Sequence, residues 1–164
     1  MYERILVPLD GSKRAECVLP HVEALAKTCA TAEVILVWVA ERVIGYRVSE
    51  SGSQPMWERT ASVAGARMSP EAVAKEEKQG QEYLAKMAKI LEDKGVKVRT
   101  EVLMGKPAEE IVIYANNKKC DLIVIASHGR SGFARWTHGS VADRVFKATA
   151  VPILMIKAPD YKGI

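Results

Sequence analysis

The chain has 164 residues, of which 48% are hydrophobic and 27% are charged, proportions typical of a globular protein. A chain of this length buries enough surface to fold without disulfides or a structural metal, so we expect a single domain over residues 1–164. Basic residues exceed acidic residues by 24 to 20 and are dispersed along the chain. This weak, dispersed charge argues against a nucleic-acid partner and is compatible with small phosphorylated ligands.

The cysteine usage, together with the lack of a recognisable membrane span or signal peptide, predicts an intracellular protein. Cys17, Cys29 and Cys120 are odd in number and lack C-x-x-C spacing, which predicts reduced thiols and neither a disulfide framework nor a zinc site. No apolar run approaches the roughly 20 residues of a membrane span. The N-terminal residues do not resemble a signal peptide. We therefore expect a cytoplasmic protein with no membrane partner.

The first 40 residues predict a strand, a helix and a second strand. Residues 5–9 are apolar and are followed by Asp10-Gly11-Ser12, a turn whose serine can cap the next helix. Pro20 should kink that helix or displace its start, because proline lacks an N–H group. Residues 33–40 are almost continuously apolar, as in a strand covered on both faces. The helix should bury a stripe formed by Val18, Val22, Leu25 and Cys29.

Residues 41–69 form a long insertion without hydrophobic period. The segment contains Gly45, Gly52, Pro55 and Gly65. Connections of this length in compact domains are often functional, so the segment is a candidate ligand cover or partner surface. A plain disordered loop is the equal alternative.

A second helix and an edge strand should follow the insertion. Ser69-Pro70-Glu71 combines a capping serine, a proline and an acidic first turn, and Gly95 supplies the C-terminal stop. Residues 96–102 alternate between valine or threonine and charged residues, which predicts a half-exposed edge strand. The helix should bury Val73, Gly80, Leu84, Met87 and Leu91.

The last third of the chain predicts two more helices and two more strands. One helix should run from Gly105-Lys106-Pro107 to about Asn117, and strands are expected at residues 122–126 and 152–156. Gly139-Ser140 should open the final helix. Strands alternating with helices predict an α/β fold: an open, doubly wound, five-stranded parallel sheet with helices on both faces. The inward residues should be Ile111, Val112 and Ala115 in the first of these helices and Val141, Val145 and Ala148 in the second.

A ligand site in such a sheet is expected where the strand order reverses, beyond the carboxyl ends of the strands. The segments that follow strands one, two and four are residues 8–12, 39–41 and 126–140. The third segment has glycines and should end at a helix N-terminus, which favours a phosphate. A tight turn would explain the glycines equally well. Neither a Walker A motif nor G-x-G-x-x-G is present, so P-loop hydrolysis is not expected.

Five segments, taken in order, resemble the universal stress protein family over essentially the whole chain. They are I-L-V-P-L-D-G-S, V-I-L-V-W-V, G-K-P-A-E-E-I, C-D-L-I-V-I-A-S-H-G-R-S-G and G-S-V-A-D-R-V-F-K-A-T-A-V-P-I-L-M-I-K. ATP-binding members carry G-x-x-G-x9-G-[ST], which Gly129, Gly139 and Ser140 match here. Ala126 stands where that pattern has its first glycine, and adds one methyl group. The resemblance implies an adenine nucleotide alpha-hydrolase-like fold that binds ATP, with Mg only through the nucleotide.

The same resemblance implies roles for individual residues. Pro8 and Leu9 would line the base pocket, and Val39 would offer its backbone to the adenine edge. Asp10 would lie beside the ribose or a phosphate-bound metal ion, although an Asx turn explains Asp10 as well. The remaining implied nucleotide-binding residues follow the fourth strand and open the last helix: Ala126, Ser127, His128, Gly129, Arg130, Ser131, Gly132, Gly139, Ser140 and Val141.

The last strand is also a candidate interface. Residues Val151 to Lys157 are apolar and come last in the sheet, so the unpaired edge invites association. Members of the family resemble one another in pairing through this strand, and an isologous pairing gives a two-fold dimer. We therefore expect a homodimer.

Three functions are compatible with these observations. The first is a cytoplasmic stress-response regulatory protein that binds ATP or a related adenine nucleotide and signals to an unknown protein partner. The second is an enzyme with slow ATPase or phosphotransfer activity in the same pocket, although no catalytic base is identifiable. The third is an interaction module that binds no nucleotide, which Ala126 and the insertion at residues 41–69 would explain.

Overall fold

The computed structural model describes residues 2–29, 32–40, 70–127 and 141–159. The predicted insertion at residues 41–69 and the loop at 128–140 therefore lie outside the described residues. Within the described part, five parallel strands form one sheet in the order β3-β2-β1-β4-β5. The strands are β1 (Arg4–Pro8), β2 (Glu33–Ala40), β3 (Lys97–Met104), β4 (Leu122–Ser127) and β5 (Ile153–Lys157).

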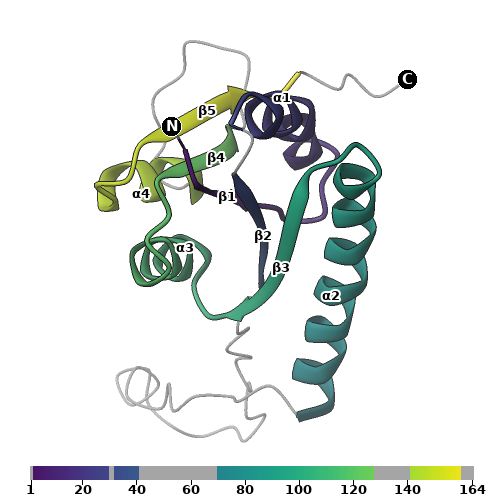
Figure 1. Ribbon diagram of the computed structural model, residues 1–164. Coiled ribbons are helices and arrows are strands. Elements are labelled where there is room, and N and C mark those ends of the chain that lie inside the picture. Colours follow the sequence, from purple (N-terminus) through teal and green to yellow (C-terminus); the bar gives the residue numbers. More distant parts are fainter. Residues whose placement is uncertain (1, 30–31, 41–69, 128–140, 160–164) are drawn as a thin grey trace, which may run out of the picture.

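Helices cover both faces of this sheet (Figure 1). Successive apolar side chains of the central strands point to opposite faces of the sheet and form two separate hydrophobic cores, one on each face. Ile5 and Val7 of β1 point to one core, whereas Leu6 points to the other. The first core is closed by η1 (Ala15–Val18), α1 (Leu19–Thr28) and α2 (Pro70–Glu92), and the second by α3 (Pro107–Asn117) and α4 (Val141–Ala148). The doubly wound parallel fold predicted from the sequence is thereby confirmed.

The start of α1 follows the expectation for Pro20. The chain first makes the short 3-10 helix η1, whose residue Ala15 donates its N–H to Ser12 Oγ at 3.1 Å. The α-helix begins only at Leu19, with Pro20 in its first turn. Proline fits there because the first N–H groups of a helix have no intrahelical acceptor.

The inward face predicted for the last helix is wrong in two of its three residues. Val145 is buried, but Val141 is 37% exposed and Ala148 is exposed. Ala142 is buried instead. Residues 141, 145 and 148 do share one side of a helix, but α4 is rotated so that Ala142 and Val145 face the sheet. Spacing alone does not distinguish two adjacent stripes on so short a helix.

Both predicted edges of the sheet are confirmed, since β3 and β5 end the strand order. In β3 the strand begins one residue later and ends two residues later than the alternation indicated. Gly95 ends the helix before it with a positive φ of 83°, as expected for a glycine stop. In the described residues, no helix is long and apolar enough to cross a membrane.

Leu36 tests the packing of the first core. Its side chain is fully buried in β2, so Leu36→Ala should lower the free energy of unfolding by about 2–5 kcal/mol, through lost burial and the cavity left behind. The control is Ile90→Ala on α2, because Ile90 is 40% exposed. Urea unfolding of both variants measures the difference. Equal losses would contradict the assignment of Leu36 to the core.

Candidate functional site

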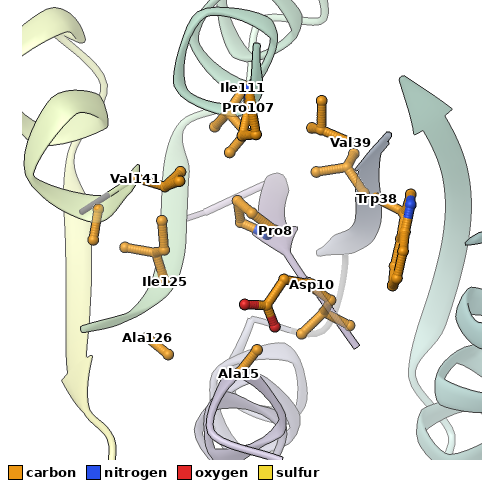
Figure 2. Close-up of a pocket in the computed structure, with 13 residues that line it drawn as sticks. Pro8, Asp10, Ala15, Trp38, Val39, Pro107, Ile111, Ile125, Ala126 and Val141 are labelled. Atoms are coloured by element: carbon orange, nitrogen blue, oxygen red, sulfur yellow. The ribbon is translucent and has the colours of Figure 1, made fainter. Parts of the chain in front are cut away.

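A cavity of about 410 Å³ lies at the carboxyl ends of β1, β2 and β4. β1 is the point where the strand order reverses, because β2 and β3 lie on one side of it and β4 and β5 on the other. The first residues of α3 and α4 close the cavity from the second face of the sheet (Figure 2). A ligand pocket at this place is what the topology of open parallel sheets favours.

The structure brings together six of the residues selected from the sequence. The end of β1 and the turn after it contribute Pro8, Leu9 and Asp10. The ends of β2 and β4 contribute Val39 and Ala126, and the start of α4 contributes Val141. Ser127 is described but does not line the cavity. The others lie outside the described residues: His128, Gly129, Arg130, Ser131, Gly132, Gly139 and Ser140.

Sequence reasoning missed seven residues of the cavity wall. Pro107 and Ile111 belong to α3, which follows an edge strand and was therefore not expected at the reversal point. Both residues lie in G-K-P-A-E-E-I, one of the five segments that resemble the family, so the resemblance contains a signal for this part of the wall. The other missed residues are Ala15, Val37, Trp38, Ile125 and Ala142.

Asp10 supplies the acidic group of this wall. Its Oδ1 accepts a hydrogen bond from the Ser12 N–H at 2.9 Å, so the Asx-turn role expected for this residue is confirmed. In Figure 2 the carboxylate points into the cavity. A carboxylate has two oxygens with about four acceptor positions, so the turn leaves acceptor capacity for a ligand hydroxyl or a cation.

The cavity wall borders α2 through Trp38. Trp38 lies against Tyr83 with ring centroids 5.4 Å apart and an angle of 58° between the planes. The Tyr83 hydroxyl donates to Glu16 Oε1 at 3.4 Å. Burial raises the pKa of Tyr83, and the negative charges of Glu16 and Asp10 raise it further. The phenol is therefore neutral throughout the physiological pH range.

The cavity can bind a flat, largely apolar group and one polar or cationic group. Its walls are mostly aliphatic, and Asp10 is the ionisable residue among the described residues that line it. The described residues contain no cluster of three or more His, Cys, Asp or Glu that could hold a metal ion. The described wall, with its aliphatic side chains and one carboxylate, suits a small ligand that has an apolar ring and a polar group.

The sequence profile of the universal stress protein family matches residues 1–157. The chain belongs to the universal stress protein family. Among curated relatives, universal stress protein MJ0531 of Methanocaldococcus jannaschii is 38% identical over 159 residues, which cover 97% of this chain and 84% of the relative. The family resemblance inferred from the sequence motifs is confirmed.

Solved structures of the family share this fold. The structure of MJ0577, also from Methanocaldococcus jannaschii, matches with a TM-score of 0.71 and 31% identity over 98% of this chain and 99% of that chain. This match confirms the adenine nucleotide alpha-hydrolase-like fold. A universal stress protein from Archaeoglobus fulgidus, solved in complex with dAMP, matches with a TM-score of 0.60 and 23% identity over 95% and 98% of the two chains.

The raised pKa of Tyr83 makes a prediction about alkaline stability. In the unfolded chain the phenol ionises near pH 10, whereas in the folded protein it stays neutral to higher pH. The stabilising contribution of Tyr83 is therefore fully present below about pH 10 and is lost as the pH rises above it. Urea unfolding between about pH 8 and about pH 11 should show a steeper loss of stability for the native chain than for Tyr83→Phe. If the free energy of unfolding fell equally with pH in both proteins, the raised pKa of Tyr83 would be contradicted.

Proposed function

We propose that this protein is a cytoplasmic stress-response regulator that binds ATP or a related adenine nucleotide as a homodimer. The observation that carries the proposal is the aliphatic cavity with the Asp10 carboxylate, at the point where the strand order reverses. The dAMP complex of the Archaeoglobus fulgidus relative supports an adenine nucleotide as the ligand class. Binding would signal to a protein partner rather than lead to chemistry.

The size and lining of the cavity fit an adenine base. Its volume of about 410 Å³ is within the range of about 300–1,000 Å³ of small-molecule sites. Aliphatic side chains enclose it from three sides: Val39 from β2, Pro107 and Ile111 from α3, and Ile125 and Val141 from β4 and α4 (Figure 2). The adenine ring would pack among them, with the Val39 backbone at its polar edge.

The polar parts of the nucleotide would lie toward Asp10 and α4. Asp10 would accept a hydrogen bond from the ribose or hold an Mg ion carried by the phosphates. The helix dipole at the start of α4 favours negative charge, and the residues before Val141 include the sequence motif of Gly129, Gly139 and Ser140. The phosphates would therefore extend from Asp10 toward Val141.

The two edges of the sheet favour β5 as the dimer interface. The β3 edge carries Lys97, Arg99 and Glu101, and such charges discourage strand pairing. The β5 edge is apolar up to Lys157, and Met155 is 41% exposed there. On the neighbouring helix α4, Phe146 is 62% exposed. A second copy of the chain, paired through residues 151–157, would cover this apolar edge.

Calorimetric titration with Mg-ATP tests nucleotide binding. The native chain should bind saturably, and Val141→Glu should abolish binding, because it places a negative charge at the cavity wall beside the phosphates. Val141 is 37% exposed and an acidic residue suits the first turn of a helix, so the variant should fold. Ala150→Glu is the matched control, since Ala150 is exposed and does not line the cavity.

A Gly139→Val and Ser140→Ala double variant tests the phosphate motif in the same titration. Loss of ATP binding with retained dAMP binding would assign these residues to the distal phosphates. Absence of any binding by the native chain at millimolar nucleotide would overturn the proposal in favour of an interaction module.

The dimer prediction is tested by Met155→Arg. An arginine at the β5 edge should repel its symmetry mate in the pairing of two such edges and convert the dimer into a monomer. Ile90→Arg is the matched control, because Ile90 on α2 is 40% exposed against 41% for Met155. Light scattering coupled to size-exclusion chromatography measures the mass. A native monomer, or a dimer that persists in Met155→Arg, would refute the β5 interface.

A further inference from the structure

The indole of Trp38 lies between two glycines from distant parts of the chain. A Cβ atom built on Gly80 of α2 would be 2.7 Å from Trp38 Cδ1, closer than real Cβ contacts. A Cβ built on Gly11, in the turn after β1, would be 3.0 Å from Trp38 Cζ3. The two edges of one ring therefore contact α2 and the β1 turn at positions where no side chain larger than hydrogen fits without movement.

Among the residues that the structure describes, packing rather than hydrogen bonding holds this ring. Trp38 Nε1 is buried and has no hydrogen-bond partner among the described residues. Tyr83 packs against the indole and is tied to η1 through Glu16. Because close packing transmits strain and no hydrogen bond from the described residues fixes the indole, a shift of a neighbouring surface should displace it.

The turn that the indole contacts carries the acidic group of the cavity. Gly11 follows Asp10 directly and has a positive φ of 79°, a conformation that side chains other than glycine rarely adopt. Asp10 Oδ1 and the Ser12 N–H close the same turn. Because a single peptide bond joins Gly11 to Asp10, a displacement of the Gly11 backbone also moves the residue that carries the carboxylate.

We propose that Trp38 is a positioning residue that sets the location of the Asp10 carboxylate by wedging the turn at residues 10–12 against α2. This inference deepens the proposed function, and its ligand-binding consequence rests on that function. Its physical consequence is that a change on α2, on the far side of the indole from the turn, alters the cavity.

Gly80→Ala tests this coupling from outside the cavity, because Gly80 does not line it. The added methyl group should push the indole toward Gly11. Alanine is a better helix former than glycine, so α2 itself is not weakened by propensity. Gln79→Ala is the control, since Gln79 is the exposed neighbour on the same helix.

Two readouts are compared. In ¹⁵N-¹H spectra without ligand, the Gly11 amide should shift, and the Ser12 amide should exchange faster as its bond to Asp10 loosens. The Kd for Mg-ATP should rise between about 2-fold and about 30-fold, the usual range for residues that act through others. Gln79→Ala should leave both readouts unchanged.

The smaller ring of phenylalanine provides the rescue. In the double variant Trp38→Phe with Gly80→Ala, the Ser12 exchange rate and the Kd should return to the values of Trp38→Phe alone. If Gly80→Ala acted only by destabilising the fold, the double variant would not regain the Ser12 exchange rate and the Kd of Trp38→Phe.

The outcomes separate the inference from the proposed function. Unchanged Gly11 and Ser12 signals in Gly80→Ala overturn the positioning role, whatever the protein binds. Shifted signals in a chain that binds no adenine nucleotide support the positioning role and refute the proposed function. If Gly80→Ala does not fold, Trp38→Phe alone decides, because unchanged Gly11 and Ser12 signals in that variant also overturn the role.

Discussion

Burial of β1 on both faces and along both edges is the constraint on which the rest of the structure depends. Ile5, Leu6 and Val7 are fully buried, and β1 pairs with β2 on one side and β4 on the other. With β1 in the centre, the chain must build outward in one direction and then return to build in the other. The cavity forms at this reversal, so the candidate site follows from the same requirement that buries the core.

A second dependence is the fit of Trp38 between two glycines. Gly80 weakens the interior of α2 relative to alanine by about 1 kcal/mol in propensity. Because Gly80 has no side chain, α2 approaches the sheet closely enough for its backbone to contact the Trp38 indole. Three elements that are distant in the sequence, namely the β1 turn, β2 and α2, therefore meet beside the cavity. The cavity wall is in this way part of the packing of the first core.

The two edge strands of the sheet differ in the side chains that they expose: those of β3 are mostly charged and those of β5 are mostly apolar. On β3, Lys97 forms an ion pair with Glu33 at 3.5 Å, and Arg99 forms one with Glu101 at 2.8 Å. This edge therefore carries charged side chains that already have ion-pair partners. The β5 edge instead exposes apolar side chains. Edge strands without charges are prone to association. This asymmetry is the basis on which the proposed association is assigned to the β5 edge rather than to the β3 edge.

The order of the elements, the parallel sheet, both edge strands and the displaced start of α1 could be predicted from the sequence, because alternation, helical spacing, Pro20 and Gly95 act over a few residues. The reversal of strand order selected the segments 8–12, 39–41 and 126–140, and the family resemblance named Pro8, Asp10, Val39 and Ala126 within them; all four line one cavity. Only the tertiary structure decided which stripe of α4 faces the sheet, that Pro107 and Ile111 close the cavity, and that Gly80 makes room for Trp38. These features depend on the rotation and approach of whole elements, which close packing against distant segments determines and local sequence does not encode.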